Sequence, residues 1–155
     1  EKIRSLSFEL VSSTLYRIGL SEAIQELCEA MEARYGIALE VESPGHVGGI
    51  DDSTATVLFK AARELLFNVV KHARVKRATV SVRHDGETLS LAVEDHGVGF
   101  ANGRDAEARG AGGGLGLFGI RERLAHVGGW MQVQSVPGIC TRVTLRVPLA
   151  STDAK

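Results

Sequence analysis

The sequence predicts an α/β fold, a two-layer sandwich of a mixed sheet and helices. Helical and strand-like hydrophobic patterns alternate along the chain, and two pairs of strand patterns are each joined by a short turn. The 155 residues, 44% hydrophobic and 24% charged, are enough for one domain with a sizeable core. Because the alternation of helices and strands is combined with two hairpins, we expect the sheet to be mixed.

The N-terminal part should hold two helices and one strand. Apolar residues at roughly helical spacing predict a helix over 1–15. Ser21 is a good N-cap for a second helix, and Gly36 suits the position just after its end. Residues 37–41 then have the pattern of a strand, and a loop rich in glycine follows over 43–49.

The middle of the chain predicts a third helix and a first hairpin. Asp52 or Ser53 should cap the helix, which is expected over about 53–73. Strands are predicted at 78–83 and 89–94, joined by an Asp-Gly turn.

The C-terminal part predicts a loop, a helix and a second hairpin. Residues 101–113 are polar, rich in glycine and without a hydrophobic period, which indicates a long, mobile and functional loop. A helix is expected over 115–127, where a glycine pair ends it. Strands at 130–136 and 141–147 flank a Pro-Gly turn, and the tail at 151–155 should be frayed.

The bulk properties exclude several classes of function. A net charge of −1 gives no general electrostatic case for binding nucleic acid or an anionic membrane. No apolar run reaches the ~18 residues that a membrane span needs, and no signal peptide is visible. Cys28 and Cys140 fall in apolar segments without metal-ligand spacing, so we expect buried, reduced thiols. Because the chain starts at Glu1 in mid-pattern, we expect it to be a piece of a longer protein.

The first candidate motif lies on the predicted third helix. Lys60, Glu64, Asn68 and either Lys71 or His72 recur at helical spacing and form a polar stripe. A carboxylate and an amide oxygen one turn apart suit a hard cation such as Mg²⁺, and Lys71 could meet a phosphate. The alternative interpretation is a solvated helix face with a weak Lys60–Glu64 ion pair.

The second candidate motif ends the predicted strand 89–94. Asp95 places a carboxylate where the strand passes into a loop, and Gly97 and Gly99 let the backbone turn tightly or approach a ligand. The carboxylate could accept a hydrogen bond from the exocyclic amine of adenine. The alternative is an ordinary acidic turn, in which His96 is a turn residue.

The third candidate motif, Gly114-Leu115-Gly116-Leu117, opens the predicted helix at 115–127. With Gly119 it satisfies the pattern G-x-G-x-x-G, but a dinucleotide site also needs a preceding strand and an acid about 20 residues later. Neither is present, and no phosphate-binding G-x-x-x-x-G-K-[ST] sequence exists. What remains is a glycine loop leading into a helix N-terminus, a good position for an anion.

The order of these three motifs resembles the ATP-binding domain of sensor histidine kinases, a GHKL-type family that also includes gyrase-type and heat-shock-chaperone ATPases. The resemblance implies the Bergerat-type ATP-binding fold. It is most specific over 64–73 and 114–124, which look like the nitrate-sensor-type subfamily of bacterial two-component kinases. Residues 1–15 would then be the end of a dimerising helical hairpin, 16–150 the ATP-binding catalytic domain, and 151–155 a tail.

The resemblance also implies roles for single residues. Asn68 would hold Mg²⁺, Glu64 would polarise or deprotonate the attacking group, and Asp95 would bind adenine. The other implied contacts to ATP come from Lys71, His72, Gly97, Gly99, Gly114, Leu115, Gly116, Leu117 and Thr141.

The implied activity is transfer of the ATP γ-phosphate to a histidine on a separate helical domain. None of the five histidines has the surroundings expected of the family's phosphoacceptor. The implied partners are ATP, the dimerisation and phosphoacceptor domain of the same kinase, and a downstream response regulator, in the cytoplasm, with the parent's membrane anchoring left open. The alternatives are an anti-sigma-type protein serine kinase and a nucleotide-binding switch module without transfer activity.

Overall fold

The computed structural model describes residues 19–43, 47, 50–73, 76–97 and 115–149, with the backbone alone at 72, 73, 115 and 116. The predicted N-terminal helix, the 101–113 loop and the C-terminal tail lie outside these residues. The elements in chain order are α2 (Leu20–Tyr35), β1 (Ala38–Glu42), α3 (Asp52–Asn68), a π-helix (Val69–Ala73), β2 (Arg77–His84), β3 (Thr88–Asp95), α5 (Leu115–His126), β4 (Trp130–Val136) and β5 (Cys140–Pro148).

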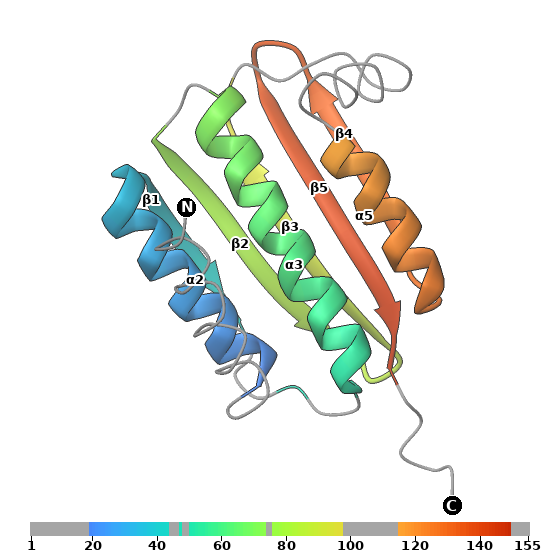
Figure 1. The fold of residues 1–155 in the computed structure, drawn as a ribbon. Coiled ribbons are helices and arrows are strands. Elements are labelled where there is room, and N and C mark those ends of the chain that lie inside the picture. Colours follow the sequence, from blue (N-terminus) through green and yellow to red (C-terminus); the bar gives the residue numbers. More distant parts are fainter. Residues whose placement is uncertain (1–18, 44–46, 48–49, 74–75, 98–114, 150–155) are drawn as a thin grey trace, which may run out of the picture.

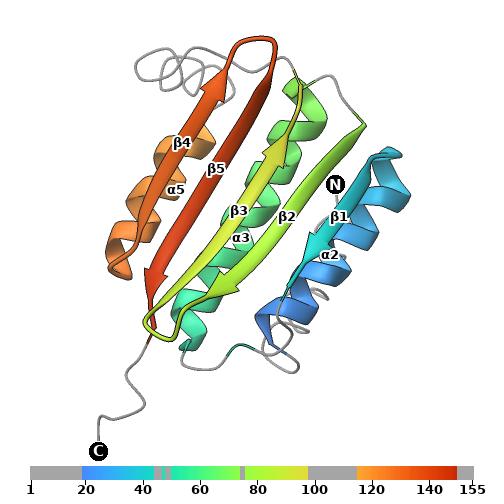
Figure 2. The ribbon, with the colours of Figure 1, turned by 180° about the vertical axis from the view of Figure 1, so that it is seen from behind.

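The described elements form two layers. Three helices lie side by side on one face of a five-stranded sheet (Figure 1), and no described helix covers the opposite face (Figure 2). The strand order is β1-β2-β3-β5-β4. β1 runs parallel to β2, and every other neighbouring pair is antiparallel. The predicted two-layer sandwich with a mixed sheet is therefore confirmed.

The core lies between the two layers and comes mainly from α3 and the central strands. The predicted apolar stripe of α3 is buried, with Leu58 and Ala62 fully inaccessible to solvent. It packs over buried side chains of β2, β3 and β5, among them Val80, Leu91 and Leu145. Side chains alternate between the two faces of a strand, so a polar residue two positions from a buried apolar residue also points toward the helices.

The structure corrects the predicted N-cap residues of α2 and α3. Gly19, and not Ser21, is the N-cap of α2, and Ser21 is buried, where its hydroxyl accepts a hydrogen bond from Ser43 Oγ at 2.9 Å. The α3 cap is Asp51 instead of Asp52 or Ser53. Its carboxylate accepts a hydrogen bond from the Thr54 amide at 2.7 Å, and this bond lowers the pKa of Asp51.

The strands and the helix ends agree closely with the prediction. Gly36 ends α2 in the left-handed conformation, with φ 69°. The α-helical part of the third helix ends at Asn68, but the π-helix carries it on to Ala73, close to the predicted end. Asp85 accepts hydrogen bonds from two following amides in the first hairpin turn. Among the described helices, none is both long and apolar enough to span a membrane.

Candidate functional site

The elements that carry the predicted motifs meet at one end of the sandwich. The C-terminal end of α3, the end of β3, the start of β5 and the first turn of α5 all lie at this end (Figure 1). α3 and α5 are also in direct contact. Side chains far apart in the sequence are thus brought to one edge of the sheet.

Asp95 is the last residue of β3 and is only 4% exposed. It shares the helix-facing side of the strand with the buried residues Leu91 and Val93. Its carboxylate accepts a hydrogen bond from the Gly97 amide at 2.9 Å. Burial raises the pKa of Asp95, and the Gly97 hydrogen bond acts in the opposite direction. The position therefore offers a weakly hydrated acceptor at the end of the sheet, as a base-binding carboxylate requires.

Thr141 lies beside Asp95 on the neighbouring strand. The register pairs Asp95 of β3 with Thr141 of β5, and Thr141 in turn with Ser135 of β4. Residues that are directly opposite in a sheet project on the same side, so the three polar side chains form a row that faces the helix layer. The distance between Ser135 Oγ and Thr141 Oγ1 is 3.0 Å. The structure therefore brings together Asp95, to which the resemblance assigned adenine, and Thr141, one of the other implied contacts to ATP.

Ser135 is a member of this row that the sequence analysis did not single out. It is 2% exposed and follows Met131 and Val133 on the helix-facing side of β4. A serine at the third inward position of an otherwise apolar alternation is the signal that could have identified it. Its hydroxyl also donates to the Cys140 carbonyl oxygen at 3.1 Å.

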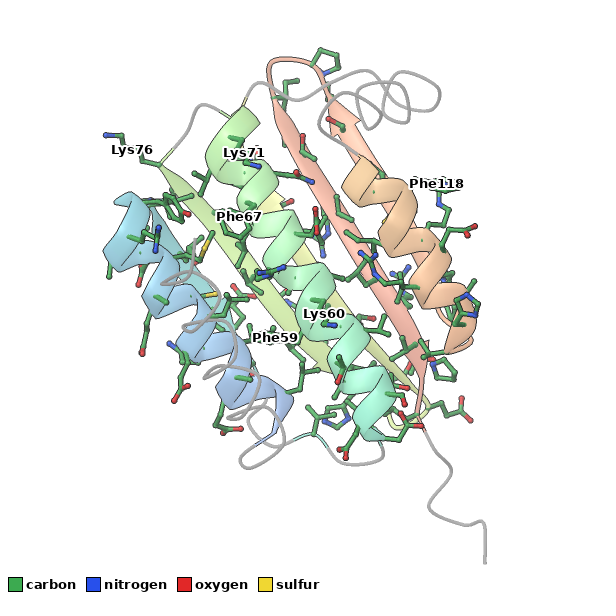
Figure 3. The ribbon with its side chains drawn as sticks, in the orientation of Figure 1. Phe59, Lys60, Phe67, Lys71, Lys76 and Phe118 are labelled. Atoms are coloured by element: carbon green, nitrogen blue, oxygen red, sulfur yellow. The ribbon has the colours of Figure 1, made fainter. Side chains whose placement is uncertain are left out.

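Glu64 and Asn68 lie one turn apart on the last turns of α3 and are both half-buried. The predicted polar stripe is thus not a fully solvated helix face, although Lys60 and Lys71 at either end of it are exposed. The Lys71 ammonium lies 5.8 Å from the centre of the Phe67 ring (Figure 3). A cation–π contact of this kind holds the ammonium near the end of α3.

The donor set fits Mg²⁺ only in part. The carboxylate of Glu64 and the amide oxygen of Asn68 are hard oxygen ligands on one helical face. No group of three or more His, Cys, Asp or Glu side chains could hold a metal within the described part of the chain. A Mg²⁺ ion at Asn68 would therefore take most of its ligands from water and from phosphate oxygens, which is how Mg²⁺ is commonly held at nucleotide sites.

The remaining predicted residues are described less completely. Gly97 is buried and Leu117 is half-buried against the core. Gly99 and Gly114 lie outside the described residues, as do the side chains of His72 and Leu115; Gly116 is described only as backbone in the first turn of α5. Their roles stay predictions.

Comparison with known families and proteins gives consistent matches. The family model described as histidine kinase-, DNA gyrase B-, and HSP90-like ATPase matches residues 53–151. The oxygen sensor histidine kinase NreB of Staphylococcus carnosus (strain TM300) is 35% identical over 149 residues, which are 96% of this chain and 42% of that protein. The chain thus spans less than half the length of this relative.

Two solved structures show the same fold. The histidine kinase domain of the Erythrobacter litoralis EL346 blue-light activated histidine kinase gives a TM-score of 0.70 at 23% identity, over 90% of this chain and 70% of that one. Full-length ShkA in complex with AMPPNP gives a TM-score of 0.71 at 22% identity, over 88% of this chain and 31% of that one.

Proposed function

The chain belongs to the histidine kinase-, DNA gyrase B- and HSP90-like ATPase family. We therefore propose that it is the part of a sensor histidine kinase that binds ATP and transfers the γ-phosphate of ATP to an acceptor. The family and the fold confirm the resemblance on which the sequence analysis relied. The observation that carries the proposal further is the direct pairing of Asp95 with Thr141 at the sheet end nearest the last turns of α3.

The sheet and the helix layer contact different parts of the bound nucleotide. Asp95 and Thr141, on the sheet, accept hydrogen bonds from the base, directly or through a water molecule. Glu64 and Asn68, on α3, lie toward the phosphate groups of ATP. Asn68 would hold Mg²⁺ there, and Lys71 would contribute positive charge. Bound Mg²⁺ would neutralise part of the charge on the phosphate oxygens. Glu64 would orient the attacking group or accept its proton.

The acceptor histidine lies on another part of the parent protein. Of the histidines whose side chains the structure describes, His84 ends β2, His96 follows β3 and His126 ends α5, and all three are exposed. Phosphoryl transfer requires an acceptor held in line with the γ-phosphate. We therefore place the acceptor on a helical dimerisation domain that precedes this chain, with a response regulator as the next phosphoryl acceptor in the cytoplasm.

Titration with a fluorescent ATP analogue, with and without Mg²⁺, tests nucleotide binding. Incubation with radiolabelled ATP then tests transfer. The chain alone should bind ATP but stay unlabelled, and adding the upstream helical hairpin should give an acid-labile label on that hairpin. Acid-labile label on the chain itself would contradict the placement of the acceptor. Acid-stable label on a protein serine would instead support the anti-sigma-type kinase, and tight binding without any transfer would support the switch module.

A further inference from the structure

The two edge strands of the sheet, β4 and β1, differ in composition. Within the described sheet, β4 pairs only with β5, and β1 pairs only with β2. The seven residues of β4 include no charged residue and no proline, whereas the five of β1 include Glu40 and Glu42, which are both exposed. Charges on an edge strand oppose its pairing with another chain. β1 has this protection and β4 lacks it.

The exposed side of β4 has an apolar residue at each end and two amides between them. Trp130 and Val136 are 48% and 46% exposed, which is unusual for large hydrophobic side chains in this fold. Gln132 and Gln134 lie between them on the same side of the strand. Because Ser135 faces the helix layer, all four side chains point to the face of the sheet that no described helix covers (Figure 2). The order apolar, amide, amide, apolar is the same in either direction along the strand.

A strand with this symmetric order is complementary to itself in an antiparallel pair. With a two-fold axis through Val133, Trp130 lies opposite Val136 of the second copy, which places an aromatic residue against a β-branched one. The same axis places Gln132 opposite Gln134 of the second copy. All seven residues of β4 are then paired, and both exposed apolar side chains of the strand become covered.

The amide pair is also compatible in its hydrogen bonding. Gln132 Oε1 accepts a hydrogen bond from Arg146 Nη1 of the same chain at 3.1 Å. The amide nitrogen of Gln132 can therefore donate to the side-chain oxygen of Gln134 in the second copy. The two-fold axis repeats this hydrogen bond on the other side of Val133.

We propose that β4 is a self-association surface, through which two copies of this chain pair edge to edge, antiparallel about Val133, and join their sheets. The axis is perpendicular to the sheet, so both helix layers lie on the same side of the joined sheet. Stable specific interfaces bury about 800 Å² per partner, and a single strand pair is smaller. The dimer is therefore weak and reversible, with an expected Kd of about 0.1–1 mM.

Sedimentation equilibrium of the chain at increasing concentration tests the inference, and tryptophan fluorescence gives a second readout. Trp130 is the single tryptophan of the chain. Because pairing would cover its ring with Val136 of the second copy, its emission should move to shorter wavelength as the dimer forms. Both measurements should give the same Kd.

Charge substitutions at the paired glutamines test the register. Gln132→Lys combined with Gln134→Lys places like charges opposite each other in both pairs and should weaken the dimer by at least about tenfold. Gln132→Glu combined with Gln134→Lys places opposite charges in both pairs and keeps an acceptor for Arg146, so it should dimerise at least as tightly as the wild type.

Glu40→Lys is the matched control for the double-lysine variant. It makes the same change in net charge, at an exposed position on the same face of the opposite edge strand, and should leave the dimer Kd unchanged. Melting temperatures of the dilute variants show whether each of them is folded.

A wild type that stays monomeric up to about 1 mM would overturn the inference and leave the β4 edge to an extended segment of this chain or of another protein. A dimer that persists unchanged in the folded double-lysine variant would overturn it as well, because the copies would then associate elsewhere. Loss of the dimer in the folded opposite-charge variant would overturn the register about Val133.

Discussion

Replacing Asp95 with asparagine should abolish most nucleotide binding and leave the fold intact. The Gly97 amide, 2.9 Å from the carboxylate, can still donate to an asparagine oxygen, so the local turn is retained. The new amide group, however, is a donor placed against the donor of the base. Losing a hydrogen bond to a charged acceptor costs about 1.5–3 kcal/mol, which corresponds to a Kd for ATP about 10–150-fold weaker.

The same substitution should change the pH dependence of stability in a defined direction. Burial raises the pKa of Asp95 in the folded protein. The folded state therefore holds the Asp95 proton more tightly than the unfolded state, and wild-type stability contributed by this group is lost as the pH rises through the raised pKa. The Asp95→Asn variant has no such loss. Without nucleotide, it should gain free energy of unfolding relative to the wild type as the pH rises through that range.

Glu94→Gln is the control, because it makes the same chemical change one residue earlier. Glu94 faces the other side of the sheet, where its carboxylate lies 3.6 Å from the Arg142 guanidinium with both side chains partly exposed. Calorimetric titration with ATP should give a near wild-type Kd for this variant. An Asp95→Asn variant that binds ATP as tightly as the Glu94→Gln control would refute the assignment of Asp95 to the base.

Three further predictions concern the metal, a glycine and the thiols. Asn68→Ala should weaken ATP binding more with Mg²⁺ than with EDTA, and equal losses would indicate a structural role for Asn68. Gly129→Ala should destabilise by about 2–3 kcal/mol in denaturant titration, because an added Cβ would lie 2.6 Å from a backbone carbonyl oxygen. A Cβ added at Gly138 would meet nothing within 4 Å, so Gly138→Ala should lower the free energy of unfolding by only about 1 kcal/mol, because of its φ of 77°. Equal losses of stability in the two variants would contradict the steric argument. Burial raises the pKa of Cys28 to about 12, so a thiol reagent should label Cys140 in the native protein and Cys28 only after unfolding.

The helix caps show where local sequence reasoning stops. Three residues in a row, Asp51, Asp52 and Ser53, can each cap a helix, and the chain uses the first of them. Ser21 has the right chemistry for a cap, but packing buries it and its hydroxyl bonds to Ser43 instead. Cap preference is a property of a few residues, whereas the choice among candidates is made by contacts between elements that are distant in the sequence.

In the candidate site, too, some features could be predicted from neighbouring residues, and others depend on residues that are distant in the sequence. The periodicity of α3 was enough to predict that Glu64 and Asn68 share a face. The glycines and the strand pattern were enough to place Asp95 at a strand end. The pairing of Asp95 with Thr141, however, depends on the register of two strands that are separated in the sequence by α5 and β4, and nothing local in either strand fixes it. For the same reason Ser135 could be recognised only when its neighbours across the sheet were known.

The sheet changes from apolar to polar side chains on its helix-facing side at the end that carries the candidate site. Along β3 the helix-facing residues are apolar up to Val93, and Asp95 is the first carboxylate among them. On α3 the half-buried pair of Glu64 and Asn68 lies near its last turn, beside the buried Leu65 and Leu66. Burial of polar side chains on the sheet is tolerated there because Asp95 accepts a hydrogen bond from the Gly97 amide and Ser135 is hydrogen-bonded to Thr141. The buried apolar side chains thus hold the two layers together, and we propose that the polar end of the sheet binds the ligand.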